Sequence, residues 1–217
     1  MLIPAKFKVT DQAVLAQFIQ DYPLATIAAS SADYVNAVHL PVLLSENESG
    51  EIRLLSHIAH NNDFLTQVEN NQDILLIFNG PHAYISPNFY PSKTKTHKAV
   101  PTWNYSVVHV RGKIVFHRDH DWIYNVIEAM SAFYEQQSQT TPWSITDAPR
   151  DYIEKMIKAV VGIEITVESM VGNFKLSQNK NAEDYSGVLD GLLKSDKISD
   201  QALLDHMKTF NKSTINK

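Results

Sequence analysis

Two histidines three residues apart are the first candidates for chemistry in this chain. His57 and His60 lie in the segment SHIAHNND, where an apolar stretch gives way to polar residues. Two imidazoles at this spacing could ligate a metal, but a third ligand at a diagnostic spacing is missing. A helix starting here could instead bind an anion, because its first N–H groups are free and partially positive. On local sequence alone, an ordinary helix cap with solvated polar side chains is the better interpretation.

Two further polar groups adjoin apolar stretches. The segment KLSQNKN supplies side-chain donors from Lys175 and Gln178 directly after an apolar strand, although a turn that closes the strand explains them too. In VPTWNY, residues 100–105, Trp103 and Asn104 stand where a strand begins. They form either an aromatic anchor at the edge of the core or a ring-stacking surface whose amide hydrogen-bonds a heterocycle. Residue chemistry alone leaves both interpretations open.

The composition excludes several classes of functional site. The chain has 217 residues, a formal net charge of −5 and no cysteine. The lack of cysteine excludes disulfides, thiolate metal sites and cysteine nucleophiles. The acidic balance argues against a broad nucleic-acid-binding face. The sequence also contains no Walker loop and no GxGxxG, GxSxG or HExxH motif. We therefore predict no metal site and assign no catalytic residue.

The N-terminal segment and the hydropathy favour a cytoplasmic location. The segment MLIPAKFKVTDQ lacks the long apolar run of a signal peptide. No stretch of the chain approaches the ~18 consecutive apolar residues of a membrane-spanning helix. We expect a soluble cytoplasmic protein.

Hydrophobic periodicity predicts the strands and helices that must position these residues. The pattern predicts roughly six or seven strands, mostly sequential, with helices at the start, middle and end of the chain. Apolar runs predict two separate strands at 73–80 and 81–87. Alternating strand–helix units are absent, which argues against a doubly wound nucleotide fold. The pattern favours an α+β fold with a barrel, a barrel domain at 1–180 and a helical extension at 181–217.

Several segments together resemble one bacterial family. HLPVLL, FNGPHAYISPNFYPSK, VPTWNYSVVHVRG, DAPRDYIEKMIKAVVGIEI and NFKLSQNK occur in the order and spacing of PaiB-type proteins, the FMN-binding negative transcriptional regulators. The resemblance covers about residues 1–191. It implies an antiparallel split β-barrel related to the pyridoxamine-phosphate oxidase and flavin-reductase folds. It also implies a homodimer with FMN in a groove at the dimer interface.

The resemblance assigns a cofactor role to several positions. In the wider superfamily, basic and hydroxyl side chains from the second strand and from the corner after the third strand hold the flavin phosphate. The corresponding residues here are His39, Ser56, His57, His60 and Asn62. The other implied cofactor-binding residues are Trp103 and Asn104, beside the flavin in the dimer groove, and Lys175 and Gln178.

This sequence departs from the family pattern where the phosphate would bind. His60 stands where the family usually has an arginine, and Asn173 stands where it usually has a basic residue. An arginine is always charged and binds a phosphate with two parallel hydrogen bonds, whereas a neutral histidine does neither. Asp63 adds a negative charge nearby. We expect these changes to weaken phosphate binding.

Three functions remain open from the sequence. The first is a PaiB-like, FMN-binding negative regulator, for which contact with DNA is implied by the resemblance only. The second is a flavin-dependent oxidoreductase or a haem-binding split-barrel protein. The third is a dimer that has lost its cofactor, which the departures at His60 and Asn173 would explain.

Overall fold

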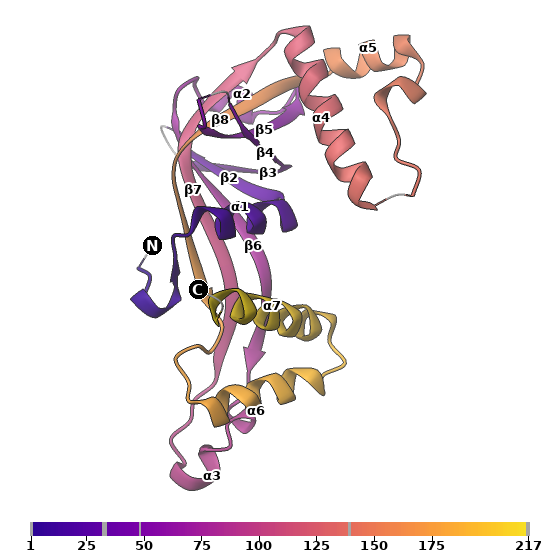
Figure 1. The fold of residues 1–217 in the computed structure, drawn as a ribbon. Helices are drawn as coiled ribbons and strands as arrows, with labels where there is room; N and C mark the ends of the chain where they lie inside the picture. Colours follow the sequence, from indigo (N-terminus) through magenta and orange to yellow (C-terminus); the bar gives the residue numbers. More distant parts are fainter. Residues whose placement is uncertain (1, 32–33, 48, 139, 216–217) are drawn as a thin grey trace. The chain divides into compact units, whose positions relative to one another are not determined.

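Three long strands contribute residues to both compact units of the molecule. A computed structural model of the chain (Figure 1) describes residues 2–31, 34–47, 49–138 and 140–215. One unit, here the barrel unit, comprises Ala16–Phe78 and His109–Met170. The other, here the tail unit, comprises Met1–Leu15, Asn79–Val108 and Val171–Lys217. The shared strands are β6 (Asp73–Ile85), β7 (Thr102–His117) and β8 (Val160–Lys175).

The strands form one sheet in the order β3-β2-β6-β7-β8-β5-β4, with the short β1 paired to β8. The remaining strands are β1 (Lys8–Val9), β2 (Leu24–Ser30), β3 (Val35–Pro41), β4 (Leu43–Glu46) and β5 (Ile52–Ala59). Alternate side chains point to opposite faces, so that Ala25, Ile27 and Ala29 of β2 are all buried. The pairs β1–β8, β2–β3, β2–β6, β4–β5 and β5–β8 are antiparallel.

The two edge strands of this sheet, β3 and β4, follow one another directly in the chain, and the turn between them closes the barrel. β3 ends at Pro41 and β4 begins at Leu43, although the two strands lie at opposite ends of the strand order. A proline has no N–H to give to a ladder, so strand pairing stops where it stands. The Ser56 hydroxyl on β5 donates to the Pro41 carbonyl at 2.7 Å, which ties the turning point to the opposite edge. The sheet therefore closes, as the sequence predicts.

A long helix covers one face of the barrel unit. α4 (His120–Ser138) begins where the Asp119 carboxylate accepts a hydrogen bond from the Trp122 N–H at 2.9 Å. Val126 and Met130 of α4 pack with Leu43 of β4 in one hydrophobic cluster. The unit also contains α2 (Phe64–Gln67), a 3-10 turn at Ile145–Asp147 and α5 (Arg150–Lys158).

The tail unit is built around two helices at the end of the chain, α6 (Ala182–Leu193) and α7 (Ile198–Ile215). Asn181 caps α6 by accepting a hydrogen bond from the Asp184 N–H at 2.8 Å. Figure 1 shows α7 lying across the strands of this unit. The unit also contains the 3-10 turns Ala5–Phe7 and Pro87–Phe89 and the short helix α3 (Lys93–Thr96), whereas α1 (Gln12–Asp21) has residues in both units. The tail expected from residue 181 onward is thus helical, and its unit also includes segments from earlier in the chain.

The two strands predicted at 73–80 and 81–87 are one continuous strand, β6. Its pairing with β2 runs from Ala29↔Ile74 to Ala25↔Phe78. Pro81 comes after this pairing has ended, so its missing N–H costs no hydrogen bond to β2. The prediction of a break at this proline was therefore wrong.

A glycine on β8 lets α4 approach the sheet. A Cβ built on Gly162 would lie 2.1 Å from Cζ3 of Trp122. We expect Gly162→Ala to lower the free energy of unfolding by about 1–3 kcal/mol, the usual cost of overpacking a core. Urea unfolding followed by circular dichroism measures this loss.

The Trp122→Ala background supplies the control for this prediction. Without the indole ring, the added methyl group has room, so the penalty of Gly162→Ala should shrink in the double variant. An equal penalty in both backgrounds would show that the indole is not what the glycine accommodates.

Candidate functional site

The predicted site residues fall into two groups, one in each compact unit. The barrel unit contains His39, Ser56, His57, His60 and Asn62. The tail unit contains Trp103, Asn104, Lys175 and Gln178.

Ser56 and His57 are neighbours on β5 whose side chains point to opposite faces. Ser56 is fully buried, and its hydroxyl is used at the Pro41 turning point. His57 pairs in register with Gly162, which places it on the face that Trp122 covers. Burial lowers the pKa of His57 below its usual range. His57 is therefore neutral at pH 7 and contributes no positive charge to the predicted phosphate site.

His39 and Asn62 lie on elements that contact one another. His39 is exposed on β3, and β3 contacts both β5 and α2. The Asn62 side-chain oxygen accepts a hydrogen bond at 3.0 Å from the N–H of Phe64, the first residue of α2. α2 is only four residues long, and the Thr66 N–H also has a partner, the Asp63 carbonyl. A single helical turn has little macrodipole, so any anion bound at this corner depends on side chains.

The exposed imidazole of His60 lies beside an arginine that the sequence reasoning missed. Nη1 of Arg118 is 3.2 Å from Nε2 of His60, although 58 residues separate the two in the chain. The topology explains the contact. Gly112 of β7 lies against Thr166 of β8. Arg118 follows Gly112 by six residues, and Thr166 follows Val160, the first residue of β8, by six residues. The His60 N–H bonds the Ala159 carbonyl at that same place.

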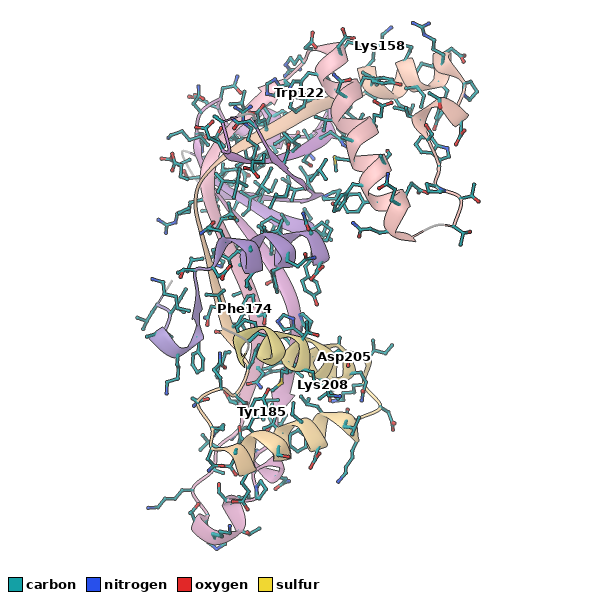
Figure 2. All side chains as sticks on the ribbon, in the orientation of Figure 1. Trp122, Lys158, Phe174, Tyr185, Asp205 and Lys208 are labelled. Carbon is teal, nitrogen blue, oxygen red and sulfur yellow. The ribbon has the colours of Figure 1, made fainter. Side chains whose placement is uncertain are left out.

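A hollow of about 300 Å³ opens beside this pair. Its basic residues are His60, Arg118, His120 and Lys158, and its apolar residues are Ile123, Ile157, Val160 and Val161. Figure 2 shows Lys158 at the C-terminal end of α5. The carboxylates of Asp121 and Glu154 accept hydrogen bonds from the His120 ring and raise the pKa of His120. The charge of protonated His120 is therefore already balanced, and His60, Arg118 and Lys158 are the polar groups that remain.

In the tail unit, Trp103 is half exposed and stands in an aromatic cluster. Its ring centroid lies 6.0 Å from that of His82 and 6.2 Å from that of Tyr84, which meets it edge-on. The three side chains line a hollow of about 330 Å³ together with Phe89 and residues at the start of α7. Partly exposed rings around a hollow can stack on a planar ligand.

Asn104 points to the opposite face of β7 and is fully buried. Its amide donates to the Ser177 hydroxyl at 2.9 Å. Lys175 donates to the Thr102 hydroxyl, and the side-chain oxygen of Gln178 accepts from the Leu176 N–H at 2.7 Å. The polar groups of these three predicted residues thus have partners inside their own unit. Their role in cofactor binding stays a prediction.

Asn173 is buried on β8. Its amide donates to the Tyr105 hydroxyl at 3.0 Å. A longer cationic side chain at this position would need either a different path to the surface or a partner for its charge. The amide therefore suits the packing here.

Comparison with known proteins assigns the family. Residues 1–169 match the family described as "Putative FMN-binding domain". The chain belongs to this family. A relative from Bacillus subtilis, "Protease synthase and sporulation protein PAI 2", is 32% identical over 192 residues and covers 88% of this chain and 89% of its own length. The PaiB-type resemblance seen in the sequence is thereby confirmed.

The family extends beyond bacteria, and its fold is shared more widely. An uncharacterized protein of Aspergillus fumigatus is 32% identical, with 83% of this chain and 86% of the relative covered. The structure of a FAD- and haem-binding protein from Mycobacterium smegmatis aligns with a TM-score of 0.57 at 11% identity, covering 83% of this chain and 78% of that one. At such identity the likeness shows the fold alone, and it confirms the predicted α+β split β-barrel.

The part of the chain that the structure describes has neither a candidate membrane-spanning helix nor a candidate metal cluster. Across residues 2–31, 34–47, 49–138 and 140–215, no helix combines the length and apolar character needed to cross a membrane. Within the same ranges, no three histidine, cysteine, aspartate or glutamate side chains are grouped so as to hold a metal ion.

The burial of His57 predicts a pH dependence of stability. An unfolded histidine takes up a proton near its ordinary pKa of 6.5, whereas folded His57 resists protonation. The unfolded state then binds more protons as the pH falls through 6.5, so stability should fall between pH 7 and pH 5. His57→Gln should reduce that loss, which urea unfolding at the two pH values measures. An NMR titration would contradict the assignment if the His57 ring, identified by its absence in His57→Gln, titrated at or above 6.5.

Proposed function

We propose that the protein binds FMN as a homodimer. The observation that carries the proposal is the match of residues 1–169 to an FMN-binding family. FMN has a planar, apolar ring system at one end and a phosphate at the other. Its site therefore needs a stacking surface and a cluster of cationic donors.

Each compact unit, taken by itself, has a place whose residues suit one chemical part of FMN. The half-exposed rings of Trp103, Tyr84 and His82 suit the isoalloxazine, because aromatic faces stack on planar heterocycles. The hollow beside His60 and Arg118 carries cationic donors and no carboxylate, which suits the phosphate. When bound, FMN would supply redox chemistry, and the aromatic residues would orient its ring.

Exposed apolar side chains of the tail unit support the homodimer. Val100, Leu193 and Ile198 are 75%, 59% and 88% exposed, and Trp103 and Tyr84 are about half exposed. Large exposed apolar side chains that gather on one part of a protein often mark an interface. Covering them with a second copy would also shield a bound flavin ring from water.

Trp103→Ala tests the assignment of the flavin ring. Stacking on an aromatic side chain contributes ~1–3 kcal/mol, so we expect the affinities for FMN and riboflavin to fall about tenfold. Quenching of flavin fluorescence measures both. Trp143→Ala is the matched control, because Trp143 is 40% exposed and lies in the barrel unit. Equal effects of the two variants would remove Trp103 from the site.

The visible spectrum of the purified protein separates this function from its alternatives. Flavin absorbance near one FMN per chain, together with a dimer by light scattering, is the expected result. A Soret band after haem addition would favour a haem protein, and binding of neither ligand would favour a dimer that has lost its cofactor. NAD(P)H oxidation by the FMN-loaded protein would identify an oxidoreductase.

Negative regulation of transcription is the second candidate, and the Bacillus relative named for protease synthesis and sporulation favours it. We expect the protein to shift DNA from upstream of its own gene at lower concentration than random DNA of equal length. Gel-shift titrations at several salt concentrations measure this difference, since non-specific contacts with phosphates weaken steeply as salt rises. Identical curves for the two DNAs would exclude specific recognition by this chain.

A further inference from the structure

The structure brings the guanidinium of Arg118 next to His60, although the two residues lie far apart in the chain. We propose that Arg118, oriented by His60 and assisted by Lys158, binds the phosphate group of FMN. The inference rests on the proposed function and names the residues that recognise the charged end of that ligand.

The first support is that other sources of positive charge at this corner are weak. His57 is buried and neutral. α2 has only one turn, and Asn62 already bonds the Phe64 N–H at its beginning. Ser56 is buried and bonded to Pro41. A phosphate here would therefore depend on long cationic side chains.

The second support is the geometry of the Arg118–His60 pair. A guanidinium nitrogen can only donate, so Nε2 of His60, 3.2 Å away, must be the acceptor. The imidazole is then neutral, with its proton on Nδ1. This single bond orients the guanidinium and leaves four of its five N–H donors for other partners. Two of them can bind a phosphate with parallel hydrogen bonds.

The third support is that the charge of Arg118 is not neutralised by the protein. Two of the four arginines have carboxylate partners, because Arg53 bonds Glu164 at 2.6 Å and Arg150 lies 3.9 Å from Glu154. Among the residues that the structure describes, no ion pair joins Arg118 or Lys158 to a carboxylate. Asp119, the nearest acidic residue in sequence, caps α4 instead.

The lining of the hollow beside Arg118 differs in charge from the linings of three other hollows. Three other hollows, beside Arg111, Arg150 and Lys197, each have aspartate or glutamate in their lining. The hollow at Arg118 has none, and its apolar residues exclude water from one side of a bound anion. A dry wall strengthens charge-assisted hydrogen bonds. The site therefore suits a phosphate monoester better than a neutral or cationic ligand.

The test compares FMN with riboflavin, which has the same ring but no phosphate. We expect Arg118→Ala to weaken FMN binding at least tenfold and to change riboflavin binding less than twofold. Arg111→Ala is the matched control, because Arg111 is exposed on β7, the strand that ends one residue before Arg118, and also has no carboxylate partner among the described residues; it should leave both affinities within twofold. Arg118→Lys, which keeps the charge but not the paired donors, should be intermediate. It also serves if the alanine variant does not fold.

A rescue experiment locates the phosphate more closely. Moving the guanidinium to the neighbouring position, with His60→Arg in the Arg118→Ala background, should recover most of the lost FMN affinity. A double variant no better than Arg118→Ala alone would place the phosphate elsewhere and overturn the inference.

The outcomes separate this inference from the proposed function. If the wild-type protein binds FMN and riboflavin equally, or if Arg118→Ala behaves like Arg111→Ala, flavin binding stands and the role of Arg118 is overturned. If the wild-type protein binds neither flavin at millimolar concentration, the proposed function fails and the inference fails with it.

Discussion

The turn at Pro41 and Val42 is the constraint on which the barrel depends. Here a single segment leaves one edge of the sheet and begins the other, so its backbone groups cannot all find partners in a strand ladder. Other elements provide them: Ser56 bonds the Pro41 carbonyl, Pro23 accepts from the Val42 N–H, and Tyr134 of α4 donates to the Val42 carbonyl at 2.8 Å. A buried backbone group left unpaired would cost about 1–3 kcal/mol. The closure of the barrel thus depends on side chains from β5 and α4 as much as on the strands.

Charged side chains of the barrel unit also contact partners on other strands. Glu164 lies under α4, where it bonds Arg53 at 2.6 Å and has Nε2 of His117 at 3.1 Å. His117 in turn stacks on Trp122, with ring centroids 3.9 Å apart. This half-buried network pairs Arg53 with Glu164. Arg118 is the next residue after His117, but it lies past the end of β7 and is exposed. One position along the chain therefore separates a ring stacked on Trp122 from an exposed guanidinium.

Much of the fold could be predicted from the sequence, because its signals are local. The strand at 24–30 and the helix from 120 onward were visible in hydrophobic periodicity, and the family motifs indicated the split barrel. The contact of Arg118 with His60 was not visible, because it depends on the register of two strands that flank a third. Asn104 shows a related limit. Its position beside Trp103 suggested a shared surface, yet neighbouring residues on a strand face opposite sides, and only the position of α7 decides which side is buried.

The tail unit consists of three separate chain segments, and this has a consequence for how the protein is made. Asn104 and Ser106 of β7 bond Ser177 and His206, which the ribosome delivers many residues later. The Ser92 hydroxyl likewise donates to the carboxylate of Asp184, which is synthesised much later and lies 2.8 Å away in the folded protein. The barrel unit has all its residues once Met170 is synthesised, whereas these polar groups stay without their partners until α6 and α7 emerge. During translation, the strand that carries Trp103 therefore completes these polar contacts only after the last helices are synthesised.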